Sequence, residues 1–138
     1  MHQTSTAILT CMDFRFWPLA LDAFAEQYGS FDLISMAGGA KNIASPTKDA
    51  YHQAMIDNIA TSIKLHGTTR LVMTNHTDCG GYGGSCMFEA HDHEIEFHRC
   101  ELMTAKKVIQ KLFPDINVDT VILHRPNGGG ELCLIGVS

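Results

Sequence analysis

The strongest constraint on the fold is the regular alternation of short apolar runs with segments of helical periodicity. Apolar runs at residues 7–11, 31–37 and 70–75 have the length and character of buried strands, and glycines follow the second of them. The segments between these runs carry apolar side chains at helical spacing. Strands that alternate with helices favour a parallel sheet with helices packed on its faces.

Three helices are expected from this spacing. One covers residues 17–28, and a second opens with Ser45 as its N-cap and Pro46 in its first turn and stops near Gly67. In the third, residues 91–112, side chains three and four apart share one face. That inward face holds His91, Ile95, His98, Leu102, Ala105, Ile109 and Leu112. We therefore expect His91 and His98 to point inward and His93 to point outward.

The end of the chain predicts a hairpin, because residues 118–124 and 131–137 are apolar and a glycine-rich segment separates them. The expected fold class is α/β, with a mainly parallel four-stranded sheet, an antiparallel edge strand, and helices on both faces. A length of 138 residues with 45% hydrophobic side chains suits a single domain spanning residues 1–138.

Composition excludes several classes of function. The formal net charge of -5 argues against nucleic-acid binding, because phosphates call for an excess of Lys and Arg. No apolar stretch approaches the ~20 residues that span a bilayer, and the first residues do not resemble a signal peptide. Five cysteines with eight histidines indicate reduced thiols in the cytoplasm, used for metal binding or catalysis.

Two of the expected strands end in residues suited to binding a transition metal. Cys11 closes the first strand, and His76 and Cys79 follow the third. Ligands of open α/β sheets bind beyond the carboxyl ends of the strands, where these three side chains are expected. Two thiolates and an imidazole favour zinc, and three protein ligands leave a fourth position for catalysis. The alternative is a buried cysteine that acts as a small apolar side chain, next to a loop without metal.

Two motifs carry a resemblance to a known family. The segment Cys11-Met12-Asp13-Phe14-Arg15, followed by His76-Thr77-Asp78-Cys79-Gly80, resembles the Cys-x-Asp-x-Arg and His-x-x-Cys-Gly motifs of the β-class carbonic anhydrases, in particular short archaeal and bacterial members. Ala37-Gly38-Gly39 takes the place of that family's Arg-Asn-Ala-Gly segment, with Ser35-Met36 where the family has Arg-Asn. The closing hairpin resembles the family's last two strands, so the resemblance spans most of the chain.

This resemblance implies zinc-dependent, reversible hydration of carbon dioxide to bicarbonate and a proton. It makes Cys11, His76 and Cys79 the ligands of one Zn²⁺ per chain, and Asp13 with Arg15 the catalytic dyad. It also implies a homodimer or a higher homo-oligomer. Asp13 is then expected to orient the attacking water, while Arg15 keeps Asp13 ionised and off the metal. The alternative for this pair is an ordinary structural salt bridge.

Other functions remain open on the same residues. Relatives of this fold hydrolyse carbonyl sulfide or carbon disulfide, which are linear molecules like carbon dioxide. A non-catalytic protein would result if Asp13 permanently closed the coordination sphere of zinc. A metal-free nucleotide-binding domain is the most distant alternative, because residues 80–84 lack the Lys-Ser/Thr of a P-loop. We expect those glycines to give the backbone freedom beside the metal.

The remaining polar residues suggest less specific roles. Asp78 is expected to serve the loop or a helix cap rather than catalysis. The histidines at positions 91, 93 and 98 are expected to be partly buried or solvated, with a proton shuttle or a second metal site as the alternative. Structural roles are expected for Cys86, Cys100 and Cys133.

Overall fold

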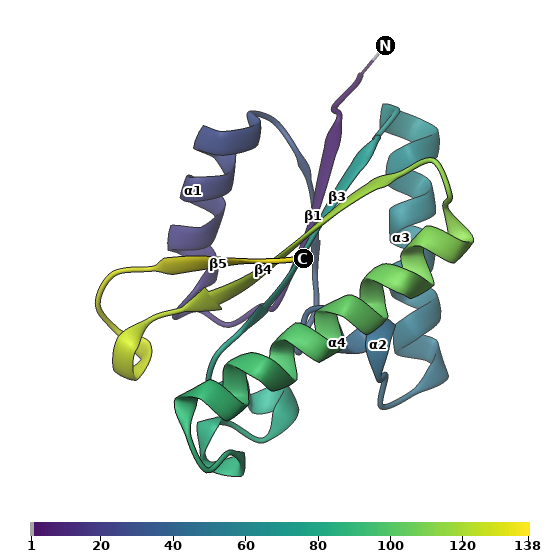
Figure 1. The fold of residues 1–138 in the computed structure, drawn as a ribbon. Coiled ribbons are helices and arrows are strands. Elements are labelled where there is room, and N and C mark those ends of the chain that lie inside the picture. Colours follow the sequence, from purple (N-terminus) through teal and green to yellow (C-terminus); the bar gives the residue numbers. More distant parts are fainter. Residues whose placement is uncertain (1) are drawn as a thin grey trace.

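The computed structural model, which describes residues 2–138, has one five-stranded sheet with helices on both faces (Figure 1). Its strands are β1 (Thr6–Thr10), β2 (Asp32–Ser35), β3 (Arg70–His76), β4 (Asn117–His124) and β5 (Cys133–Val137). Their order across the sheet is β2-β1-β3-β4-β5. The first four strands pair in parallel, and β5 runs antiparallel to β4. The fold class expected from the sequence is therefore confirmed.

The helices form two layers around the sheet. They are α1 (Trp17–Tyr28), α2 (Lys41–Ala44), α3 (Asp49–His66) and α4 (His91–Leu112). Helix α1 covers one face, where Phe24 packs in a cluster with Ile8, and the other three helices cover the opposite face, where Leu9 and Ile109 share the larger core. Neighbouring residues of β1 thus enter different cores, as the alternation of a strand requires. Within residues 2–138, no helix has both the length and the apolar character that crossing a bilayer demands.

The N-cap predicted at Ser45 is wrong. Ser45 ends the short helix α2, because its backbone N–H donates a hydrogen bond to the carbonyl oxygen of Lys41. Its hydroxyl donates to Glu101 of α4 rather than to a helix that follows it. Helix α3 begins at Asp49, after an extended residue. A helix of four residues has too few apolar positions to show a helical periodicity, so α2 could not be predicted from the sequence pattern.

The inward face predicted for the long helix is correct along most of its length but wrong at its first and last residues, since His91 and Leu112 are exposed. Leu102, Ile109 and His98 are fully buried. His91 lies beside His124 at the carboxyl end of β4, where its side chain stays exposed to solvent. Its ring lies against that of His124, with 4.5 Å between the centroids.

Candidate metal centre

The carboxyl ends of β1 and β3 bring together the three residues suited to binding a metal. Cys11 directly follows β1, His76 is the last residue of β3, and Cys79 lies in the loop after it. The two strands pair in parallel, with Leu9 opposite Met73, so their ends lie side by side. One ligand atom from each of the three residues lies within 4.8 Å of the other two, and all three residues are buried.

The imidazole of His76 has the hydrogen bonding of a metal ligand. Its Nδ1 lies 2.7 Å from the carbonyl oxygen of Thr77, to which it can only donate, so the lone pair is left on Nε2. Nε2 is buried and has no hydrogen-bond partner. The ring is held in place by stacking on Phe16, with 4.2 Å between the centroids. A buried ring nitrogen without a partner is costly unless it has another ligand, and a metal ion supplies one.

Ionisation of one cysteine side chain opposes ionisation of the other. The hydrogen bond from the Cys79 thiol lowers the pKa of Cys11 to about 4, and the backbone N–H of Gly38, 3.4 Å from the Cys11 sulfur, acts in the same direction. The pKa of Cys79 is raised, because its thiol donates a hydrogen bond to the Cys11 sulfur, and burial and the Cys11 charge oppose a second ionisation. A divalent cation between the sulfurs would remove this obstacle, since thiolate is the form that binds metal. The donor set therefore fits zinc.

The turn after β2 approaches the centre so closely that it needs glycine. Gly39 has a φ of +54°, and a Cβ there would lie 2.6 Å from the carbonyl oxygen of Thr74 and 3.3 Å from the backbone nitrogen of Cys11. Only a residue without a side chain fits between Thr74 and Cys11. The Gly38-Gly39 pair, recognised in the sequence as the end of a strand, thus lets the turn after β2 pack closely against β3 and Cys11.

Replacing Gly39 by alanine is therefore expected to lower the free energy of unfolding by at least about 2 kcal/mol, from backbone strain and the clash with Thr74. Gly136→Ala is the matched control, because Gly136 has no positive φ and a Cβ added there would meet no atom within 4 Å. Urea unfolding of both variants measures the difference. Equal stability of the two variants would show that the turn can relax.

Asp13 and Arg15 form an ion pair at the edge of the cluster. The Arg15 Nη2 donates to Asp13 Oδ2 at 2.7 Å, and Nε lies 3.1 and 3.2 Å from the two carboxylate oxygens. The backbone N–H of Arg15 donates to Oδ1 at 2.8 Å. These bonds from Arg15 hold the pKa of Asp13 below its usual range. Asp13 Oδ2 lies 3.7 Å from His76 Nε2, so the carboxylate borders the position that a metal would take.

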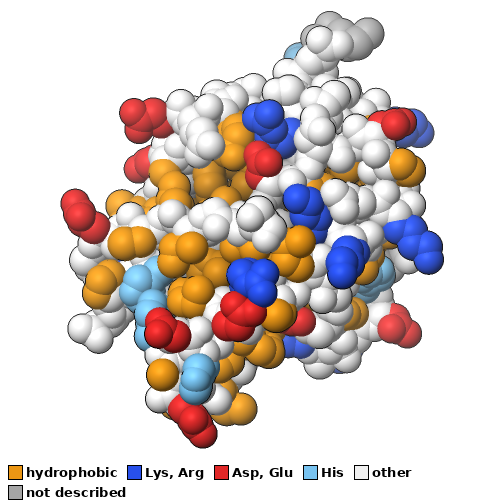
Figure 2. Space-filling model, in the orientation of Figure 1, with side chains coloured by type: hydrophobic (Ala, Val, Ile, Leu, Met, Phe, Trp, Pro, Cys, Tyr) orange, Lys and Arg blue, Asp and Glu red, His pale blue; other side chains and the backbone are white. Residues whose placement is uncertain are grey.

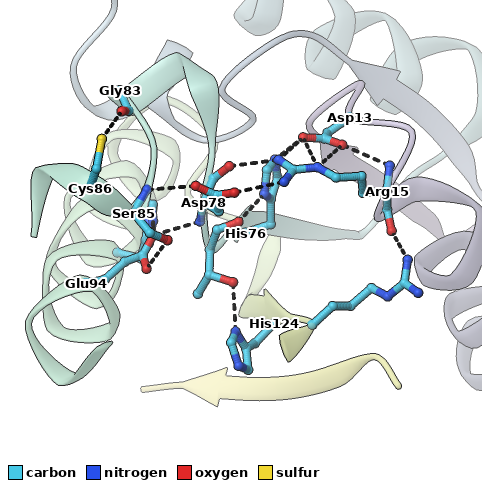
Figure 3. Close-up of polar contacts among 12 residues, drawn as sticks. Asp13, Arg15, His76, Asp78, Gly83, Ser85, Cys86, Glu94 and His124 are labelled. Atoms are coloured by element: carbon cyan, nitrogen blue, oxygen red, sulfur yellow. Dashed lines mark hydrogen bonds and ion pairs between the residues drawn. The ribbon is translucent and has the colours of Figure 1, made fainter. Parts of the chain in front are cut away.

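Asp78 holds Arg15 from the other side, a role that the sequence interpretation missed. The Arg15 Nη1 donates to Asp78 Oδ2 and Nη2 donates to the Asp78 carbonyl oxygen, both at 2.8 Å (Figure 3). The guanidinium is thereby fixed between two acidic residues, and the Arg125 side chain donates to the carbonyl oxygen of Arg15. The position of Asp78 one residue before Cys79 was the available signal, because it places a carboxylate at the same sheet edge as Arg15.

The cluster opens into a surface hollow of about 550 Å³. Asp13 and Arg15 supply its charged groups, and Met12 and Phe14, which are 66% and 79% exposed, supply apolar surface. The remaining lining is the sulfur-bearing Cys11 and small residues: Ala37, Gly80 and Gly81. The hollow thus presents one ion pair in otherwise apolar surroundings, which suits a small uncharged molecule.

The other candidates from the sequence lie outside this cluster. His98 is fully buried, and burial lowers its pKa to about 4. His93 is exposed, as expected. Cys86, Cys100 and Cys133 are exposed free thiols. Within residues 2–138, the single group of three or more possible metal ligands is the one formed by Cys11, His76 and Cys79.

Fold and site together define an α/β protein with three potential metal ligands at the carboxyl edge of a parallel sheet. The family model described as "Putative carbonic anhydrase" matches residues 1–125. The chain belongs to this family, and its fold is that of the β-carbonic anhydrases.

Individual relatives agree in fold. The carbonic anhydrase from Glaciozyma antarctica superposes with a TM-score of 0.65 at 17% identity, over 99% of this chain and 83% of that one. The apo form of a carbon disulfide hydrolase gives 0.57 at 16% identity, over 89% and 76% of the two chains. In sequence, an uncharacterised protein of Rickettsia bellii is 26% identical over 129 residues, which are 89% of this chain and 78% of that protein. At these identities the structural matches show a shared fold.

Proposed function

We propose that this chain is a zinc-dependent carbonate dehydratase that interconverts carbon dioxide and bicarbonate. The observation that carries the proposal is the buried Cys11, His76 and Cys79 cluster with a carboxylate, Asp13, held beside it by an arginine. The three residues would hold one zinc ion per chain. Zinc, when bound, supplies the Lewis acidity that makes a water molecule nucleophilic near neutral pH.

The roles of the protein side chains follow from their hydrogen bonds. Asp13 is ionised, so it accepts a hydrogen bond from the attacking water and directs the lone pair of that water toward carbon dioxide. Arg15 occupies both oxygens of Asp13 and so keeps the carboxylate from swinging onto the metal. The Thr77 carbonyl keeps His76 in the tautomer that binds through Nε2.

The hollow fits the proposed substrate. Carbon dioxide is small, linear and uncharged, and the Met12, Phe14 and Ala37 surface offers it apolar contact beside Asp13.

Thiolate ligands require reducing conditions, so we also propose that the protein works in the cytoplasm.

A comparison of three substrates tests the proposal against its nearest alternative. The zinc-loaded protein is assayed with carbon dioxide, carbonyl sulfide and carbon disulfide, because one structural neighbour is a carbon disulfide hydrolase. We expect turnover of carbon dioxide to be the fastest. If either sulfur compound releases hydrogen sulfide with a higher kcat/KM, the protein is a carbonyl sulfide or carbon disulfide hydrolase that uses the same site residues.

We further propose that the chain assembles into a homodimer or a higher homo-oligomer. Hydrophobic side chains gather over the β4–β5 hairpin in Figure 2, and β5 is an edge strand in which Leu134 is 42% exposed. Such surface is a frequent site of association, and two-fold dimers are the commonest closed assembly. Light scattering at micromolar concentration is expected to give at least twice the chain mass of 15.2 kDa. A strict monomer would refute this proposal.

A further inference from the structure

The buried carboxylate of Glu94 has no role in the mechanism above, although it touches the loop that carries Cys79. Glu94 lies in the first turn of α4 and is 3% exposed. Its Oε2 accepts a hydrogen bond from the backbone N–H of Asp78 at 2.7 Å, and its Oε1 accepts one from the hydroxyl of Ser85 at 2.8 Å. Both bonds go to the loop and neither goes to α4, so this carboxylate is not a helix cap.

These contacts fix an unusual backbone conformation. Asp78 has a φ of +56°, in the left-handed region that a non-glycine residue occupies only at a cost. The loop is closed around it, because Asp78 Oδ1 accepts the backbone N–H of Ser85 at 2.8 Å. Glu94 therefore binds the two residues at which the loop between Asp78 and Ser85 begins and ends.

The conformation of Asp78 determines how Arg15 is bound. In the left-handed conformation, Asp78 presents both its carbonyl oxygen and its Oδ2 to the Arg15 guanidinium, each at 2.8 Å. Arg15 in turn bonds Asp13 (Figure 3). A continuous chain of hydrogen bonds thus leads from Glu94 through Asp78 and Arg15 to Asp13.

We propose that Glu94 is a positioning residue that holds Asp78 in its left-handed conformation and thereby sets the orientation of Arg15 against Asp13. The expected effect on the hydration rate rests on the proposed function. The placement of Asp78 and Arg15 by Glu94 does not depend on which substrate the protein uses. Without Glu94, Asp78 relaxes, Arg15 loses its second anchor, and Asp13 gains freedom to reach the metal.

The test compares Glu94→Ala with Glu94→Gln and with Glu96→Ala, an exposed carboxylate on the same helix. Glu94→Ala is expected to retain one metal ion per chain and to lower the kcat of hydration about tenfold to a hundredfold, as loss of an outer partner does at metal sites, with little change in KM. Glu94→Gln should recover most of the rate, because its amide can still accept from Asp78 N–H and donate to the Ser85 hydroxyl. Glu96→Ala should match the wild type.

A readout that needs no turnover separates this proposal from the proposed function. In cobalt-substituted protein, the visible spectrum of Glu94→Ala is expected to shift toward that of Arg15→Ala, because in both variants the Asp13 carboxylate reaches the metal. If the wild type does not hydrate carbon dioxide, the proposed function fails while the spectra still test the positioning. A wild-type spectrum and rate in Glu94→Ala would overturn the inference. Should that variant not fold, Glu94→Asp, whose shorter side chain cannot span Asp78 and Ser85, is tested in the same way.

Discussion

Replacing Cys79 by serine is expected to remove nearly all bound zinc and, with it, hydration of carbon dioxide. A serine hydroxyl does not replace a thiolate at a site that also depends on Cys11 and His76. Loss of an outer partner of a metal ligand already costs about tenfold to a hundredfold in affinity, so loss of a ligand itself should exceed about a hundredfold. Elemental analysis after dialysis measures the zinc content, which should be about one per chain in the wild type.

Cys100→Ser is the matched control for this experiment. Cys100 is also a free cysteine, but it is exposed on α4 and belongs to no ligand cluster within residues 2–138. It is expected to keep full zinc content and full activity. Full zinc occupancy in Cys79→Ser would contradict the assignment of the ligands.

The second large effect is expected at Asp13. Asp13→Asn should keep zinc but lose about two to three decades in rate, or roughly 3–4 kcal/mol, because the amide presents a donor where the attacking water needs an acceptor. Asp22→Asn, a carboxylate on α1 away from the cluster, controls for the change in net charge. Hydration rates of both variants, with zinc measured in each, test this prediction. Equal rates in wild type, Asp13→Asn and Arg15→Ala would reduce the pair to a structural salt bridge.

Arg15→Ala should fail in a different way. The freed Asp13 carboxylate is expected to bind the metal, with an oxygen about 2.0–2.2 Å from zinc in a crystal structure. Activity should fall most at low pH, where hydroxide is scarce and competes poorly with the carboxylate. An Asp13 that stays off the metal in this variant would contradict the role assigned to Arg15.

The sheet and the ligand cluster could be predicted because each leaves a local pattern in the sequence. Strand and helix periodicities identify the layers, and a parallel sheet carries the ends of β1 and β3 to one edge. Cys11 and His76 therefore come together although they are far apart in the chain. The turn at Gly39, which has a left-handed backbone, could also be predicted from the sequence, since a glycine pair marks a turn.

The supporting residues could not be predicted in the same way, because their roles depend on contacts between distant segments. In the sequence, Asp78 has the character of a loop residue, and its ion pair with Arg15 is seen only in the structure. Glu94 looks like an ordinary acidic residue in the first turn of a helix, where the dipole favours it. The available signal was its position four residues before the buried His98, which places both side chains on one face.

Stopped-flow measurement of carbon dioxide hydration by the zinc-loaded protein tests the central claim most directly. We predict catalysis well above the buffer rate, lost when zinc is removed and restored when zinc is returned. A fully zinc-loaded protein with no rate above buffer would contradict it, and would favour a zinc-binding protein in which Asp13 closes the metal site.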